Sequence, residues 1–315
     1  MLGRRQLREK VMQSIYAYNS LGTDAEERFV EKNLMKGIDQ IYDLYIYLLN
    51  LVKVQKDIAE NKIELAKNKN FPTEADLNPN MKFVENRMFR ILNQNIELSR
   101  YTNDHKNYDW DIYDTYPNNI FNQLIESDLY KDYMNSGKDS FDEDQEFILA
   151  VFEQFIAEYE DLHDWFEGIQ LNWADDLYIA NSMVYTTLKS FRSSSSPLIS
   201  LFKVYKDIDD KKFTEELFRK VIRHQSEIRK MVEEKASNWE LDRIATIDLI
   251  ILEMAITEFL YFPNIPAKVT INEYIELAKN YSTEKSKIFV NGILDKTLKE
   301  LKENNNLPKY GRGLL

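Results

Sequence analysis

Apolar residues recur at helical spacing along most of the chain. The apolar positions of residues 4–18 share one stripe, formed by Leu7, Val11, Ile15 and Tyr18. This pattern predicts an amphipathic opening helix. Similar spacing continues from residue 24 to residue 67 and predicts one very long helix or two in sequence. No alternation of apolar and polar residues is long enough for a useful strand, so the predicted fold class is all-α.

Further helices follow from the same periodicity. They are predicted over residues 81–101, 141–165, 173–191, 198–206, 213–235, 241–262, 268–280 and 284–302. The serines at positions 193–196, followed by Pro197, form the clearest linker and indicate a domain boundary nearby. Residues 303–315 are polar and contain Pro308 and two glycines, which predicts a flexible tail.

Composition narrows the possible functions. The chain of 315 residues has no cysteine, which excludes disulfides, thiolate nucleophiles and Cys-ligated metal centres. Its formal net charge of -12, taken as a total, argues against a nucleic-acid partner. However, residues 101–180 hold 20 acidic side chains and only three lysines, so the rest of the chain is mildly basic. The total charge therefore does not exclude RNA binding.

No catalytic, cofactor-binding or metal-binding arrangement is predicted. The glycines form neither a dinucleotide-binding loop nor a phosphate-binding loop, and the three histidines are scattered. We therefore expect a protein that is not an enzyme. No apolar run reaches the roughly 18 residues of a membrane span, and no signal peptide is evident, so a cytoplasmic protein is expected.

The last third of the chain contains the most distinctive sequence. Residues 265–279 read IPAKVTINEYIELAK, and residues 289–296 read FVNGILDK. Both segments resemble the NusB family of bacterial transcription antitermination factors, as does the opening RRQLREKVMQSIYAY at residues 4–18. The resemblance implies a fold of small helical bundles.

The resemblance also implies a division of the chain. Residues 1–20 correspond to the family's Arg-rich first helix, and residues 203–302 correspond to its C-terminal helical bundle. Residues 21–202 form a helical, acidic insertion that shorter family members lack, and residues 303–315 form the predicted tail.

Carried onto matching positions, the family's RNA surface includes Arg5, Arg8 and Tyr16 on the opening helix. Arginine suits this role because its guanidinium grips phosphate with two donors. Considered without the resemblance, the spacing favours a solvated terminus for Arg4 and Arg5 and a core position for Tyr16.

A second group of RNA-contact candidates lies at the start of the last helix. It consists of Lys285, Lys287, Phe289 and Asn291. An aromatic ring such as that of Phe289 can stack on an unpaired base, and lysines attract phosphate. Asn291 and Gly292 are both weak helix formers, so their presence together suggests close approach by another group. That group is either a neighbouring helix or a ligand strand.

The resemblance supplies a functional hypothesis. It implies binding of boxA-type RNA together with a NusE-like ribosomal protein, on an RNA polymerase elongation complex that transcribes ribosomal RNA. Asp248 and Glu258 could face a basic protein partner, although a solvated helix face explains them as well. The alternative hypothesis is an interaction scaffold in which the acidic insertion binds a basic protein and the RNA surface is vestigial.

Overall fold

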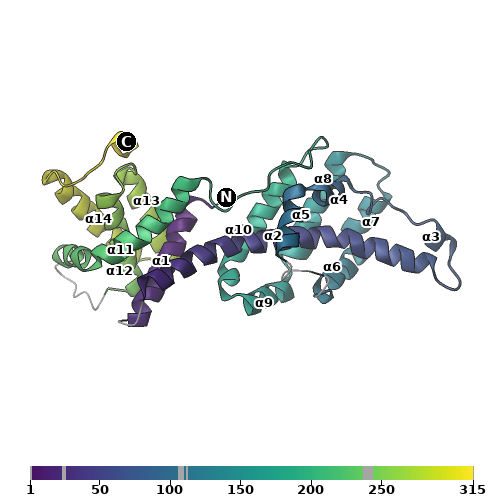
Figure 1. Ribbon diagram of the computed structural model, residues 1–315, viewed down its shortest axis with the longest axis horizontal. Helices are drawn as coiled ribbons and strands as arrows, with labels where there is room; N and C mark the ends of the chain where they lie inside the picture. Colours follow the sequence, from purple (N-terminus) through teal and green to yellow (C-terminus); the bar gives the residue numbers. More distant parts are fainter. Residues whose placement is uncertain (1, 23–25, 106–109, 111–112, 237–243, 315) are drawn as a thin grey trace. The chain divides into compact units, whose positions relative to one another are not determined.

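The computed structural model describes residues 2–22, 26–105, 110, 113–236 and 244–314. Within these residues the chain is helical and contains no strand, so the prediction of an all-α fold is confirmed. No described helix combines the length and apolar character needed to cross a membrane. The chain forms two compact units, which Figure 1 shows coloured along the sequence. Unit 1 comprises residues 39–204, and unit 2 comprises Leu2–Ile38 and Tyr205–Leu315.

Unit 2 is a bundle built around one apolar helix. Its helices are α1 (Arg4–Leu21), the first part of α2 (Glu27–Lys67), α11 (Ile208–Lys235), α12 (Thr246–Tyr261), α13 (Ala267–Tyr281) and α14 (Ser286–Glu303). Helix α12 is largely apolar, and its residues Ile250 to Phe259 are all buried, the two carboxylates Glu253 and Glu258 among them. Helix α1 packs against α11 and α12, so the opening helix contacts segments some 200 residues later (Figure 1).

Unit 1 contains the rest of α2. Its other elements are α3 (Glu74–Leu77), α4 (Arg87–Gln94), α5 (Ile96–Asp104), α6 (Thr115–Glu126), α7 (Asp128–Asn135), α8 (Phe141–Val151), the π-helical turn η3 (Phe152–Ala157), α9 (Glu160–Ile169) and α10 (Leu171–Ser190). Two tryptophans hold α2 through its backbone. Trp110 Nε1 donates to Tyr47 O at 2.9 Å, and Trp173 Nε1 donates to Gln40 O at 3.0 Å. The ring of Trp110 also stacks on that of Tyr47, with centroids 4.2 Å apart.

Asparagine caps divide the helix that was predicted over residues 81–101. Asn86 Oδ1 accepts from Met88 N at 2.8 Å and begins α4. Asn95 Oδ1 accepts from Leu98 N at 2.8 Å and begins α5. Each cap satisfies an amide that the first turn leaves without a partner, so the structure has two short helices in place of one.

Three other features of the structure differ from the predictions. The helix expected over residues 141–165 is interrupted by the π-helical turn η3, and the one expected over residues 198–206 is absent. Residues 26–38, predicted to belong to the insertion, pack with unit 2. Glu31 there accepts from Arg219 Nε of α11 at 2.9 Å.

Candidate functional site

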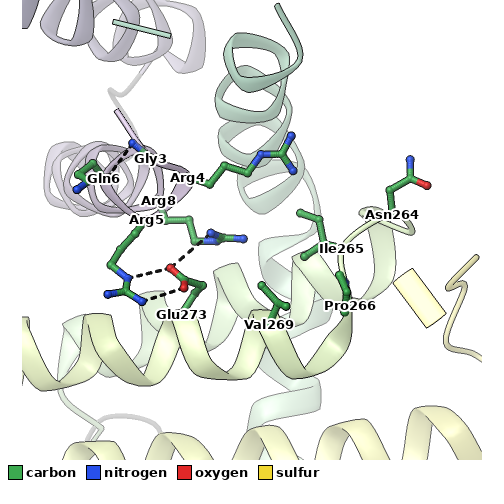
Figure 2. A pocket seen from close by; sticks show the side chains of 10 residues that line it. All are labelled: Gly3, Arg4, Arg5, Gln6, Arg8, Asn264, Ile265, Pro266, Val269 and Glu273. Atoms are coloured by element: carbon green, nitrogen blue, oxygen red, sulfur yellow. Dashed lines mark hydrogen bonds and ion pairs between the residues drawn. The ribbon is translucent and has the colours of Figure 1, made fainter. Parts of the chain in front are cut away.

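A cavity of about 460 Å³ lies at the start of α1. The chain enters the helix at Gly3, whose backbone amide donates to Gln6 Oε1 at 2.9 Å. The first turn then carries Arg4 and Arg5 into the cavity wall. Figure 2 shows the opposite side, which consists of Val269 and Glu273 on α13 and the loop between α12 and α13. The loop contributes Asn264, Ile265 and Pro266.

Arg5 occupies the cavity as a partly exposed ion pair. Its Nε and Nη2 donate to the two carboxylate oxygens of Glu273, both at 2.9 Å, while 47% of its side chain remains exposed. The hydrogen bond from Arg5 lowers the pKa of Glu273 below its ordinary value. This pairing orients the guanidinium and leaves Nη1 of Arg5 for another acceptor.

Arg4 is a cavity residue that was not among the predicted site residues. Its Nε donates to Asp210 Oδ1 at 2.8 Å, its guanidinium carbon lies 5.0 Å from the ring centroid of Phe213, and 41% of its side chain is exposed. Its two terminal nitrogens are not used in this ion pair. The basic N-terminus indicated Arg4 as a possible phosphate contact, but the resemblance assigned RNA contact to Arg5 and Arg8 instead.

Arg8 and Glu258 lie in the interior. Arg8 is 2% exposed and Glu258 is fully buried. Arg8 Nε and Nη2 donate to the carboxylate of Glu258, both at 2.9 Å, and Thr270 Oγ1 and Tyr274 Oη donate to it as well, at 2.6 and 3.3 Å. The negative charge of Glu258 holds the pKa of Arg8 above its ordinary value despite the opposing effect of burial.

This placement corrects three of the expected surface roles. Arg8 reaches the cavity wall, but its Nε and Nη2 donate to Glu258 and its Nη1 lies 3.8 Å from Glu273 Oε2. Its guanidinium therefore joins α1 to α12 and α13 and is almost completely buried. Glu258 is enclosed, and Asp248 is also buried, so neither carboxylate faces a protein partner in this structure. Glu258 has an internal role, because its buried charge is matched by Arg8 and by hydroxyl donors.

The other predicted RNA contacts lie outside the cavity but in the same unit. Tyr16 is exposed on α1. At the start of α14, Lys285 is exposed, Phe289 and Asn291 are half-buried, and Lys287 pairs with Glu284. Asn291 Nδ2 donates to Asp295 Oδ2 at 3.2 Å.

The space around Gly292 tests one of the two explanations of the Asn291-Gly292 pair. A Cβ added at Gly292 meets no heavy atom within 4 Å. A neighbouring helix therefore does not explain the glycine. The surface beside it is open and includes Ile288, which is 70% exposed.

Unit 2 belongs to the class of all-helical bundles, and arginines lie in the first turns of its first helix. The model of the NusB family matches residues 180–299. The protein named transcription antitermination protein NusB from Salinibacter ruber is 40% identical over 134 residues, which is 42% of this chain and 84% of that protein. The chain belongs to the NusB family.

Two further relatives carry the same name. The protein from Chloroherpeton thalassium is 47% identical over 112 residues, which cover 36% of this chain and 53% of that protein. The protein from Myxococcus xanthus is 41% identical over 120 residues, which cover 38% of this chain and 84% of that protein. The family match begins within α10 and excludes α1, so the arginine-bearing helix lies outside it.

Proposed function

We propose that this protein is a non-enzymatic transcription antitermination factor that binds boxA-type RNA together with a NusE-like ribosomal protein. In this role it supports ribosomal RNA transcription by an RNA polymerase elongation complex in the cytoplasm. The observation that carries the proposal is the cavity at the start of α1, where Arg4 and Arg5 stand partly exposed with unused guanidinium nitrogens. The names of the three relatives support the same role.

The distribution of charge supports RNA binding by unit 2. This unit contains 26 basic and 24 acidic residues, whereas unit 1 contains 15 basic and 29 acidic residues. Nearly balanced charge gives little non-specific attraction to phosphate, so binding depends on a few well-placed cations and on base contacts. Arg4 and Arg5 supply the cations, and Phe289 supplies a ring for stacking.

The exposed start of α14 supports a second contact surface. Lys285 and Ile288 project there beside Gly292, whose missing side chain allows close approach. We assign Phe289 and Asn291 to RNA within this surface, together with Lys285 and Lys287. Tyr16 on α1 is the remaining proposed contact.

The test is a titration of boxA-type RNA and a scrambled RNA of equal length, with and without a NusE-like ribosomal protein. We expect the boxA-type RNA to bind more tightly when the protein partner is present. Equal affinity for the two RNAs under both conditions would refute the proposal. Binding of a basic protein without any RNA discrimination would instead favour the scaffold hypothesis.

Variants separate the two kinds of contact. Arg5→Gln should weaken binding of both RNAs and reduce the salt dependence by about one phosphate contact. Phe289→Ala should cost ~1–3 kcal/mol of binding free energy if the ring stacks on a base. Arg90→Gln is the matched control, since Arg90 is exposed on α4 in unit 1.

A further inference from the structure

The residues after α14, which the sequence predicts as a flexible tail, fold back onto the end of α12 in the structure. Lys309 Nζ donates to Glu258 O at 3.0 Å and to Phe262 O at 2.9 Å. The last carbonyls of a helix lack partners within it, and a cation at this end is favourable. Tyr310 N donates to Pro263 O at 3.3 Å, which extends the contact to the next residue of the loop.

Two glycines make this contact close. Gly311 has a φ of 56°, in the left-handed region that favours glycine. A Cβ added at Gly313 would lie 1.9 Å from Pro263 O, a distance that the backbone cannot accommodate without moving. The tail therefore packs its own backbone on the α12–α13 loop and closes with the 3₁₀ turn η5 (Gly311–Leu314).

The loop held by the tail is also a wall of the arginine cavity. Asn264, Ile265 and Pro266 line that cavity opposite α1 (Figure 2), and Pro266 is the residue from which α13 begins. Asn264 Oδ1 lies 3.9 Å from the position of a Cβ at Gly311. Partial burial at this contact lowers the pKa of Lys309 to about 8.

We propose that residues 307–314 form a strap that fixes the α12–α13 loop, and that Lys309 is thereby a positioning residue for RNA binding at the arginine cavity. This inference rests on the proposed function and adds a determinant outside the cavity. The strap acts through Pro263 and its neighbours, without a phosphate contact of its own. Displacing it leaves Arg4 and Arg5 in place but loosens the wall opposite them.

Two variants disturb the strap by different means. Lys309→Met removes the donors and the charge, whereas Gly313→Ala inserts a methyl group against Pro263 O and changes no charge. Lys302→Met on the exposed last turn of α14 is the charge control. Gly168→Ala is the glycine control, because a Cβ there meets nothing within 4 Å.

The measurements are RNA affinity at several salt concentrations and amide hydrogen exchange. Both strap variants should weaken binding of boxA-type RNA by about 3- to 30-fold with an unchanged salt slope. They should also speed amide exchange at Phe262, Asn264 and Ile265, which are the loop residues that carry an amide hydrogen. The controls should do neither. A slope that falls by about 1 in Lys309→Met alone would make Lys309 a phosphate contact and overturn the strap.

The outcomes distinguish the strap from the proposed function. If the unmodified protein does not discriminate boxA-type RNA from scrambled RNA, the proposed function fails. If it discriminates and both strap variants bind equally well, the strap fails and the proposed function stands. Unchanged amide exchange at Phe262, Asn264 and Ile265 in both variants overturns the strap in either case.

Discussion

The buried pair of Arg8 and Glu258 gives the sharpest prediction about stability. In Arg8→Met, Glu258 would keep only the hydroxyl donors of Thr270 and Tyr274, at 2.6 and 3.3 Å. Both members of the pair are almost completely buried, at 2% and 0% exposure. Removing one partner of such a pair costs about 3–5 kcal/mol, because the remaining charge is left without compensation. We expect a loss of this size for unit 2.

A control variant and a double-mutant cycle test whether the loss of stability comes from the unpaired buried charge. Arg5→Met removes an ion pair whose arginine is 47% exposed, so it should cost no more than ~1 kcal/mol. The double variant Arg8→Met with Glu258→Leu should lose much less than the sum of the two single variants, because it leaves no unpaired buried charge.

The assay must report on unit 2 alone, since a chain with two compact units need not unfold in one step. Amide hydrogen exchange along α12 and α13 in increasing urea gives the free energy of opening for these helices. A loss in Arg8→Met no larger than in Arg5→Met would refute the reasoning. Additive losses in the double variant would also contradict it.

Three further predictions concern single positions. Gly292→Ala should stabilise α14 by up to ~1 kcal/mol in thermal unfolding, because open space surrounds the site, while weakening RNA binding if a ligand approaches the backbone there. The pKa of Glu273 is lowered in the folded protein by its hydrogen bond from Arg5. The stability from this pair is therefore present above the unfolded pKa and is lost as the pH falls through the folded value, which carboxyl NMR titration and acid unfolding can check. In unit 1, Asp144→Ala should lower the free energy of urea unfolding by about 1–3 kcal/mol, because the buried carboxylate accepts from Tyr133 Oη at 2.7 Å. A loss below about 0.5 kcal/mol, which is typical of a surface substitution, would contradict this prediction.

Hydrophobic periodicity was sufficient to predict the helices of unit 2. Helices α1, α11, α13 and α14 each carry one apolar stripe, and α12 is largely apolar. Local spacing contains this information because each stripe must be buried.

Helix ends that depend on distant residues could not be predicted in this way. Asn95 begins α5 and also donates through Nδ2 to Ile199 O at 2.9 Å, across 104 positions of sequence. An asparagine inside an apolar pattern is compatible with a helix interior or with a cap. Only the folded contact decides between the two.

The candidate site could be predicted only in part, because its geometry also depends on residues that are distant in sequence. The arginine-rich start of α1 was identified, but the sequence gives no sign that Arg8 turns inward while Arg4 lines a cavity. Arginine is rarely buried without a partner, and the partner of Arg8 is 250 residues away. The cavity itself is formed by segments from both ends of the chain.

The position of α1 at the beginning of unit 2 has a consequence during synthesis. Helix α1 is synthesised before residues 39–204 of unit 1, whereas its partners α11 and α12 are synthesised after them. At about 5–20 residues per second, the 250 residues between Arg8 and Glu258 take ~12–50 s to translate. Throughout this interval the apolar stripe of α1, with Leu7, Val11 and Ile15, lacks its final cover. A nascent chain halted within unit 1 should therefore expose this stripe to chaperones, and one released after α12 should not.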